Sequence, residues 1–352
     1  MGRRKKKGRN DSAKRSTSRV LAGAAATVAA MVAMGNRVVA RCAKPVVVEH
    51  GALKYLMRGT SVLGAQRLDD RNAAAFRGWA VQRATVDVLR PRAKEALVIG
   101  LGSGSVPTHW RRPPRRLKVD AVDLDPEVIA LAESSFGLAP GTTIVGDGLN
   151  VLYATPKKYD VIVVDVVDPE DPYGPGLWRF LEKDALVAAK KSLAERTGLL
   201  AFTVVAGLLD DDALDHLGAV AARLGAAFPK MRAYRDSPFT DAGATNVVFF
   251  AGDDDIFAGP MLPPRRVAEG SEAWVVANFR SWEVAACDDG TCRHTANASR
   301  PTFRADAAAP RPATGYGEVV AAGLRAHFSD DLRRRVPASC RAAAWLRRRG
   351  KS

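Results

Sequence analysis

The stretch "EALVIGLGSGSVPTHW", residues 95–110, passes from an apolar run into a turn with glycine at three alternate positions, Gly100, Gly102 and Gly104. Such an apolar run is typical of a strand that is buried on both faces of a parallel sheet. Glycine lets the following loop turn sharply, and it lets the backbone approach a ligand without a Cβ atom in between. The stretch therefore predicts either a nucleotide-binding loop or an ordinary tight turn.

Short apolar runs and helical patterns alternate along the chain after this stretch. Following the strand at 96–102, we expect strands at 118–125, 142–148, 159–169 and 198–205, and helices at 126–137, 177–193 and 210–228. This alternation predicts a parallel, doubly wound sheet with right-handed crossovers. The segments 230–236 and 245–252 follow without a helix between them, so we expect them to pair antiparallel. The fold class is therefore α/β, with the seven-stranded, mostly parallel, Rossmann-like sheet of class I methyltransferases.

Carboxylates follow each of the next three predicted strands. Asp123 ends the second strand, Asp147 ends the third, and Asp165 and Asp168 end the fourth. Ligands of open parallel sheets bind beyond the carboxyl ends of the strands, so we expect these side chains and the glycines to face one crevice. Asp123 lies about 20 residues after the glycines, where a carboxylate can accept both ribose hydroxyls. Asp147 is placed to accept a hydrogen bond from an adenine amino group.

Two of these carboxylates also have a local interpretation. Asp123 can cap the helix that begins near Pro126, although Asp125 is better placed for that role. Asp147, next to Gly148, can simply shape a turn. The shared site is favoured, because independent turns would not place carboxylates at the same end of the sheet each time.

A nucleotide cofactor without a pyrophosphate fits this loop best. We expect Pro107 to interrupt the helix that a dinucleotide fold starts at this point to receive phosphate. S-adenosyl-L-methionine contains adenine, ribose and a sulfonium, and it needs no phosphate cradle. A nicotinamide-dependent oxidoreductase is the more distant alternative.

These residues resemble the spermidine synthase-like branch of the S-adenosylmethionine-dependent methyltransferases. The resemblance covers about residues 95–252 and is carried by "LVIGLGSGSVP", "VDAVDLDPEVIALAESSFGL", "GDGLNVL" and "YDVIVVDVVDPEDPYGPGLW". It implies that the glycines flank the methionine moiety, that Asp123 binds ribose and that Asp147 with Gly148 meets adenine. Asp165 and Asp168 match the two amine-orienting aspartates in the Asp-x-x-Asp-Pro motif of aminopropyltransferases. The predicted cofactor-binding set is Gly100, Gly102, Gly104, Asp123, Leu124, Asp147, Gly148 and Asp165.

One departure from the family pattern bears on the reaction. Where spermidine synthases usually have an aspartate that pairs with the cationic amine of decarboxylated S-adenosylmethionine, this chain has Ser103. A site without that carboxylate suits a cofactor that keeps its own carboxylate. The resemblance therefore implies methyl transfer, by direct in-line attack, to an amine of a protein N-terminus, a lysine or a small molecule. Aminopropyl transfer in polyamine biosynthesis and a non-catalytic adenosyl-nucleoside-binding protein are the alternatives.

The predicted catalytic pair is Asp165 and Asp168. We expect Asp165 to orient the acceptor amine and Asp168 to complete an acidic rim. The alternative for both is a solvated loop shaped by the prolines that follow them. No residue is assigned to a metal: Cys287 and Cys292 stand close to His294, but no second ligand pair is nearby.

The net positive charge lies at the two ends of the chain. The net formal charge is +15, of which residues 1–50 carry +10 and residues 331–352 carry +7, while residues 51–330 carry −2. A near-neutral body does not predict a groove for a specific nucleic acid, although the tails can attract phosphates non-specifically.

The chain divides into four predicted regions. Residues 1–45 form a basic, alanine-rich targeting or anchor segment, 46–92 a small β-rich cap plus a helix, 93–256 the cofactor-binding domain, and 257–352 a linker and basic C-terminal extension. Low acidity with Arg, Ser and Ala favours a plastid or mitochondrial transit peptide. Cytoplasmic and membrane-anchored proteins are the alternatives, the latter only if the apolar run 20–34 acts as an anchor. In related synthases the small sheet contributes to the acceptor site and the dimer contact, which implies a homodimer here.

Overall fold

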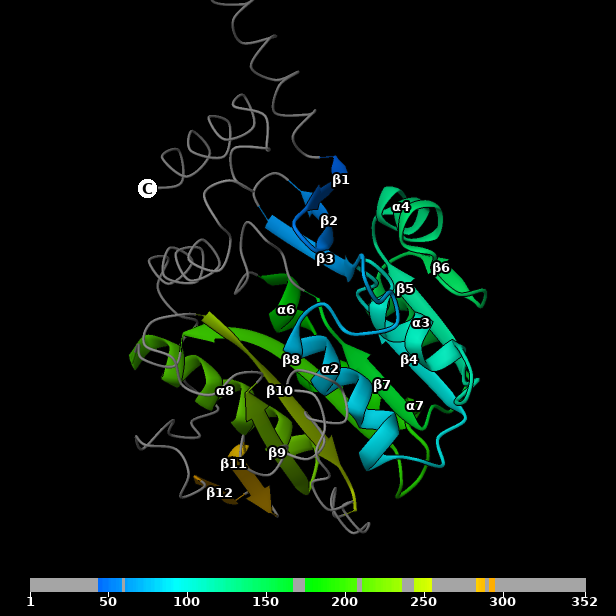
Figure 1. Cartoon of the computed structure of the whole chain (residues 1–352). Helices are drawn as coiled ribbons and strands as arrows, with labels where there is room; N and C mark the ends of the chain where they lie inside the picture. Colours follow the sequence, from blue (N-terminus) through cyan, green and yellow to red (C-terminus); the bar gives the residue numbers. More distant parts are fainter. Residues whose placement is uncertain are drawn as a thin grey trace, which may run out of the picture. The chain divides into compact units, whose positions relative to one another are not determined.

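The computed structural model describes residues 44–58, 61–166, 175–207, 211–235, 244–254, 283–288 and 291–294 (Figure 1). All of them except Lys44 belong to one compact unit, Pro45–Arg335. Asp168 and the apolar run 20–34 lie outside the described residues, so the predictions that fall on them stay predictions. Among the described residues, no helix is long and apolar enough to cross a membrane.

Strands and helices alternate along the described unit. The elements are β1 (Pro45–His50), β2 (Leu53–Arg58), β3 (Ser61–Arg67), α2 (Arg77–Ala84), the π-helical turn η1 (Thr85–Leu89), β4 (Glu95–Ile99), α3 (Ser105–Arg111), β5 (Lys118–Asp123), α4 (Pro126–Phe136), β6 (Thr143–Val145), α5 (Gly148–Ala154), β7 (Val161–Val164), α6 (Pro175–Arg179), α7 (Lys183–Ser192), β8 (Leu199–Gly207), α8 (Asp211–Ala227), β9 (Lys230–Arg235), β10 (Ala244–Gly252), β11 (Glu283–Asp288) and β12 (Thr291–His294). The single helix predicted over 177–193 was wrong: it is two helices, and α7 begins after Glu182, whose backbone is extended.

The main sheet has the strand order β12-β11-β9-β10-β8-β7-β4-β5-β6. Strands β8, β7, β4, β5 and β6 are parallel, and β10 pairs antiparallel with both β8 and β9. The predicted seven strands and their antiparallel ending are therefore confirmed. Two further strands, β11 and β12, extend the sheet beyond β9; they lie within the predicted C-terminal region 257–352, where the sequence indicated no strand.

The central strands are buried on both faces. In β4, Leu97 and Ile99 face a hydrophobic cluster that includes residues of α5, α7 and α8. The neighbouring Ala96 and Val98 face a second cluster, to which α2 and α3 contribute. Successive residues of a strand point to opposite faces, so a sheet covered on both sides requires apolar residues at every position. This explains the apolar run at the start of the stretch 95–110.

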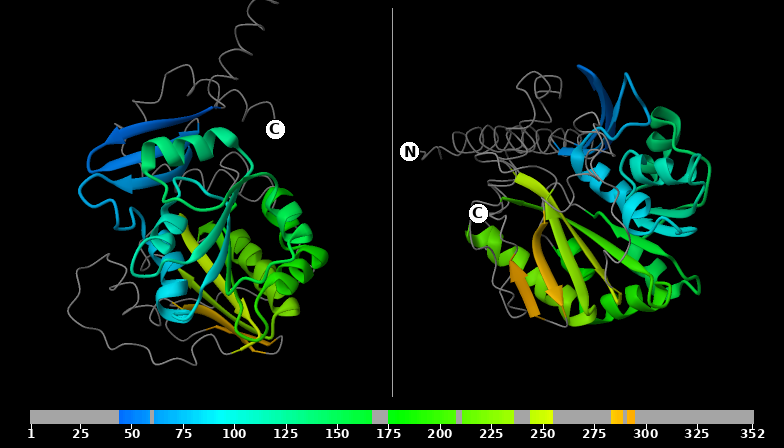
Figure 2. Two further views of the ribbon diagram at one scale, coloured as in Figure 1. Left: turned by 90° about the vertical axis from the view of Figure 1, so that its right-hand side faces the viewer. Right: turned by 60° about the horizontal axis from the view of Figure 1, so that its bottom comes forward.

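The cap is an antiparallel three-stranded sheet, β1-β2-β3, that lies beside α4 (Figure 2). The side-chain nitrogens of Lys54 and Gln66 donate hydrogen bonds to the carbonyl oxygens of Ser135 and Phe136, at 3.2 and 2.8 Å. These bonds reach the last turn of α4, so they fix the cap to this helix. The predicted N-terminal cap is confirmed.

A polar cluster lies near the amino ends of β5 and β7. The Asp120 carboxylate accepts hydrogen bonds from the Tyr159 hydroxyl at 2.8 Å and from the Lys157 ammonium at 2.7 Å. Burial, together with the hydrogen bond to Asp120 and its charge, raises the pKa of Tyr159 to about 12. Ligands bind at the opposite edge of such sheets, so this cluster provides a control position for substitutions in the site.

Candidate functional site

The carboxyl ends of four strands meet at the point where the strand order reverses. The chain adds β5 and β6 on one side of β4, and β7 and β8 on the other. The Gly100 amide donates to the Val122 carbonyl and the Asp165 amide donates to the Ile99 carbonyl, each at 2.9 Å. The Gly146 amide donates to the Asp123 carbonyl, also at 2.9 Å. The structure therefore brings the glycine loop, Asp123, Asp147 and Asp165 to one edge of the sheet.

The glycines allow a close approach between backbone segments. Gly100 has φ +91°, and a Cβ atom on it would lie 2.1 Å from the Asp165 carbonyl oxygen. Gly102 has φ +52°, and its Cβ would lie 2.4 Å from the Leu63 carbonyl oxygen in β3. Glycine at these positions is thus required by contacts within the protein, with or without a ligand. Their contact with the methionine moiety stays a prediction.

The helix after the glycine loop corrects one argument made from the sequence. Pro107 was expected to interrupt a helix here, but α3 begins at Ser105 and contains Pro107 in its first turn. Proline is tolerated there because the first amides of a helix have no partner inside the helix. The proline therefore does not exclude a phosphate-binding helix. The argument against a dinucleotide-binding fold depends instead on the antiparallel pairing of β10 with β8 and β9.

Asp123 connects the ends of two strands. Its Oδ2 accepts a hydrogen bond from the Leu101 amide and its Oδ1 accepts one from the Asp125 amide, each at 3.0 Å. An ionised carboxylate has about four acceptor positions, so capacity is left for ribose hydroxyls. The adjacent Leu124 side chain is 74 % exposed, which places an apolar surface directly beside this carboxylate.

Asp147 and Asp125 occupy matching positions at the starts of two helices. Asp125 caps α4 by accepting from the Glu127 amide at 2.8 Å, and it forms an ion pair with Arg58. Asp147 caps α5 by accepting from the Leu149 amide at 2.9 Å, and it forms an ion pair with Arg179 at 3.0 Å. Asp147 therefore has a local structural role, as the cap of α5 rather than as a turn residue. Its contact with adenine stays a prediction.

Gly148, the first residue of α5, packs against β4. A Cβ atom on this glycine would lie 2.2 Å from Cγ2 of Ile99. The close approach of α5 to the sheet therefore requires glycine, and the predicted contact with adenine is not needed to explain it.

Asp165 follows β7 and is held by side chains from distant elements. Its Oδ2 accepts a hydrogen bond from Nε2 of Gln82 at 2.8 Å, and the Trp79 side chain donates a second hydrogen bond. Burial raises the pKa of the Asp165 carboxyl, and the two hydrogen bonds oppose that rise. A carboxyl whose pKa is raised in this way is typical of functional sites.

Sequence reasoning missed Trp79 and Gln82. They lie three residues apart on α2, and this spacing puts them on the same face of a helix. The spacing was the one available signal, but nothing near them in the sequence points to Asp165. Asp168, the second predicted catalytic residue, lies outside the described residues.

The raised pKa of Asp165 predicts an effect of pH on stability. A carboxyl with a raised pKa binds its proton more tightly in the folded chain than in the unfolded chain, so its contribution to stability falls as the pH rises from about 4 through that pKa. The free energy of unfolding of the wild type should therefore fall relative to that of Asp165→Asn across this interval. Urea unfolding of both proteins from pH 4 to 8 measures the difference. Parallel curves would contradict the raised pKa.

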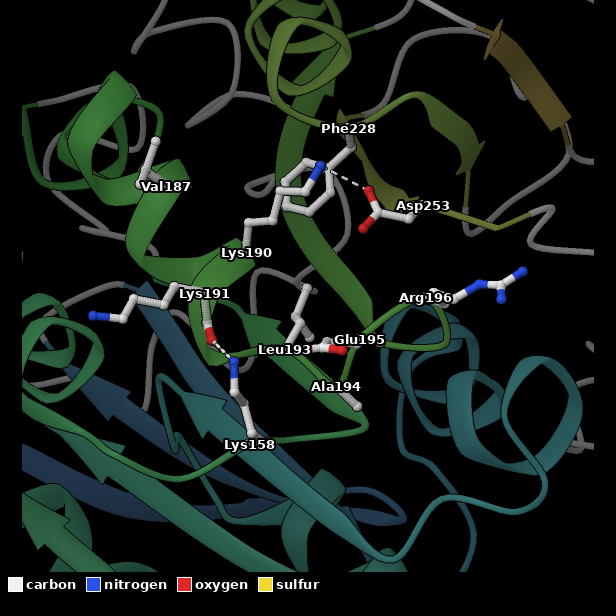
Figure 3. Close-up of a pocket in the computed structure, with 11 residues that line it drawn as sticks. Lys158, Val187, Lys190, Lys191, Leu193, Ala194, Glu195, Arg196, Phe228 and Asp253 are labelled. Carbon is white, nitrogen blue, oxygen red and sulfur yellow. Dashed lines mark hydrogen bonds and ion pairs between the residues drawn. The ribbon is translucent and has the colours of Figure 1, made fainter.

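A cavity of about 560 Å³ lies at the amino ends of β7 and β8 (Figure 3). Lys190 donates to the Ala227 carbonyl at the end of α8 and pairs with Asp253 at 2.7 Å. Lys158 donates to the Lys191 carbonyl in the last turn of α7. Lysines near helix ends satisfy carbonyls that have no partner within the helix. We interpret this cluster as structural, because it lies at the edge opposite to Asp165.

Metal ligation has no support among the described residues. In that part of the chain, no group of three or more His, Cys, Asp or Glu side chains is arranged to hold a metal ion. Cys287 and Cys292 stand opposite each other in the β11–β12 pairing.

The sheet topology defines the class of this molecule: a Rossmann-like α/β fold of the methyltransferase type, in which the strand order reverses at β4. A family model described as the spermine/spermidine synthase domain matches residues 84–196. The chain therefore contains a spermidine synthase-like domain, which confirms the resemblance seen in the sequence.

Two curated relatives represent two transfer reactions. Polyamine aminopropyltransferase 2 of Streptomyces coelicolor is 28 % identical over 248 residues, which is 67 % of this chain and 38 % of the relative. The eEF1A lysine and N-terminal methyltransferase of Mus musculus is 35 % identical over 83 residues, 22 % of this chain and 12 % of the relative. The chain thus spans well under two thirds of the length of either relative. Both relatives are named as transferases.

A solved structure supports the same fold. A probable spermidine synthase from Corynebacterium glutamicum superposes with a TM-score of 0.50 at 14 % identity, covering 73 % of this chain and 95 % of that one. At this level of identity the likeness shows the fold alone.

Proposed function

We propose that this chain is an S-adenosylmethionine-dependent methyltransferase that methylates an amine on a protein or a small molecule. The donor would lie across the carboxyl ends of β4, β5 and β6, with Asp123 at the ribose and Asp147 at the adenine. The remaining acceptor capacity of Asp123 and the exposed apolar side chain of Leu124 support this placement.

The proposal of methyl transfer rather than aminopropyl transfer depends on the environment of Ser103. Its side chain is only 5 % exposed, and its hydroxyl donates a hydrogen bond to the Ala65 carbonyl at 3.2 Å. A Cβ atom on Gly64 would lie 2.4 Å from the Ser103 amide nitrogen, so β3 packs directly on this residue. An aspartate here would lose the hydrogen bond to the Ala65 carbonyl, and its longer, charged side chain would be buried where β3 already packs against the loop. The site therefore favours a donor that keeps its own carboxylate.

Asp165 provides the acceptor side of the reaction. S-adenosylmethionine supplies an activated methyl group, because its sulfonium leaves as a neutral thioether. A protonated amine has no lone pair, so it must lose a proton before the N–C bond forms. Asp165 would bind the ammonium form, align it, and take its proton or pass it to water. Its raised pKa supports this role, because it brings the carboxyl closer to an amine in proton affinity.

Aminopropyl transfer is the second candidate, and the similarity to a polyamine aminopropyltransferase over 248 residues favours it. The two reactions differ in the donor. Purified full-length chain should be incubated with methyl-labelled S-adenosylmethionine and, separately, with aminopropyl-labelled decarboxylated S-adenosylmethionine. Each reaction receives a proteome fraction and a small-amine fraction. Label transferred from the first donor supports the proposal, and transfer from the second donor alone overturns it.

Replacing Asp147 by alanine should weaken the binding of S-adenosylhomocysteine about tenfold, the effect of losing roughly one hydrogen bond to a charged group. Isothermal titration of the purified protein measures this affinity.

Asp125→Ala is the matched control, because it removes the same kind of helix cap and the same kind of arginine pair. Both variants should lose about 1 kcal/mol of stability from the cap. Affinity should fall in Asp147→Ala alone, and an equal loss in both variants would remove Asp147 from the adenine site.

A further inference from the structure

Gln82 is a buried amide that bridges two strands of the sheet. Its side chain is 1 % exposed, and it lies on α2, which precedes the sheet strands in sequence. Its Nε2 atom lies 2.8 Å from Oδ2 of Asp165 and 2.8 Å from Oγ1 of Thr203 in β8. Thr203 is also buried, at 2 % exposure. One nitrogen therefore connects α2 with the end of β7 and with β8.

The orientation of this amide follows from its partners. An ionised carboxylate only accepts hydrogen bonds, so the nitrogen side of Gln82 must face Asp165. An amide nitrogen has two hydrogens, and here one points to Asp165 and the other to Thr203. The Gln82 side chain cannot rotate away from Asp165 without losing the bond to Thr203 as well.

The described groups that hold Asp165 are all neutral. Gln82 and Trp79 donate to it from α2, and Thr203 acts through Gln82 from β8. Within the described part of the chain, Asp165 forms no ion pair. No cation in the described ranges therefore compensates its negative charge. Because a carboxylate has about four acceptor positions, two hydrogen bonds leave room for a cationic partner.

We propose that Gln82 is the positioning residue of the acceptor site: through its bond to Thr203 it fixes the Asp165 carboxylate in the orientation that receives the acceptor ammonium. This inference rests on the proposed transfer to an amine. It assigns the alignment of that amine to a side chain outside the strand-end motifs. Trp79 supports the same carboxylate from the same face of α2.

Gln82→Met tests the role, because methionine has a similar length and no donor. We expect kcat for methyl transfer to fall roughly 10-fold to 100-fold, the effect of losing one hydrogen bond to a charged group. The Michaelis constant for S-adenosylmethionine should stay unchanged. Loss of a donor to the charged form raises the pKa of a carboxyl, so the acid limb of kcat/KM should move to higher pH. Thr203→Val should show the same changes more weakly, and Thr203→Ser, which keeps the hydroxyl, should restore wild-type values.

Tyr159→Phe is the matched control, because it removes a buried donor to a carboxylate at the opposite edge of the sheet. It should change neither kcat nor the acid limb. Titration of Asp165 in the full chain, labelled with ¹³C at the aspartate carboxyls, measures the same pKa without an acceptor. An identical Asp165 titration midpoint in the wild type and Gln82→Met, or an equal loss of kcat in Tyr159→Phe, would overturn the positioning role. Absence of transfer by the wild type with every donor would overturn the proposed function, whatever the titration shows.

Discussion

Replacing Asp165 by asparagine is expected to lower kcat for methyl transfer by about 100-fold, at the lower end of what a positioned proton acceptor contributes. Asparagine has nearly the same shape, but it carries no charge to bind an ammonium group. Asp165 belongs to the acceptor side of the proposed site, so the dissociation constant of S-adenosylhomocysteine should stay within about threefold of the wild-type value. Single-turnover assays give the rate, and isothermal titration gives the affinity.

Asp160→Asn is the control for this substitution. Asp160 stands just before β7, whereas Asp165 stands just after it, and its Oδ2 accepts hydrogen bonds from the amides of Lys94 and Glu95 at 2.7 and 3.0 Å. Loss of the Asp160 carboxylate perturbs the amino end of β7, whereas Asp165 stands at its carboxyl end. We expect kcat within twofold of the wild type, in line with a position remote from the ligand edge. Unchanged turnover in Asp165→Asn would remove that residue from the mechanism.

Gly100→Ala should destabilise the fold by about 3 kcal/mol or more, from a strained left-handed backbone and a steric overlap together. The added Cβ would lie 2.1 Å from the carbonyl oxygen of Asp165, and neither backbone segment can move without disturbing the β4–β7 pairing. Urea unfolding followed by circular dichroism measures the loss. Because the same overlap pushes Asp165 away, transfer activity should be lost even where the variant is folded.

Gly137→Ala separates the effect of backbone strain from the effect of the steric overlap. Gly137 ends α4 with φ +66°, and a Cβ atom there would meet nothing within 4 Å. This variant has the backbone strain without the overlap, so we expect a cost of about 1 kcal/mol. Equal destabilisation by the two substitutions would show that the close approach at Gly100 contributes nothing.

The order of strands and helices, and the edge of the sheet at which the strand-end residues lie, could be predicted from the sequence, because both follow local patterns. Runs such as "ALVI" and "VIVV" reveal strands buried on both faces, and the residues directly after them mark the strand ends. Asp125 could be recognised as a cap from its place before Pro126. The prediction for Pro107 was wrong because a proline is tolerated in the first turn of a helix but not further along it. A sequence pattern does not locate the start of a helix to better than one or two residues.

The contacts that complete the site could not be predicted, because they join residues far apart in the chain. Gln82 and Asp165 are separated by 83 positions, and Gln82 and Thr203 by 121. No local pattern reports which polar residue of a helix will meet which strand end. The pairing of Asp147 with Arg179, 32 positions later, was missed for the same reason.

The contact between β3 and the glycine loop has a consequence for how donor preference can change during evolution. Ser103 bonds to the Ala65 backbone, and Gly64 leaves no room beside it, so a new acidic side chain at this position would also require β3 to move. For the proposed function, we therefore expect Ser103→Asp alone not to convert methyl transfer into aminopropyl transfer. The sequences of β3 and of the glycine loop should therefore change together. Hybrid proteins that exchange the cap between relatives should fold poorly unless the glycine loop is exchanged as well.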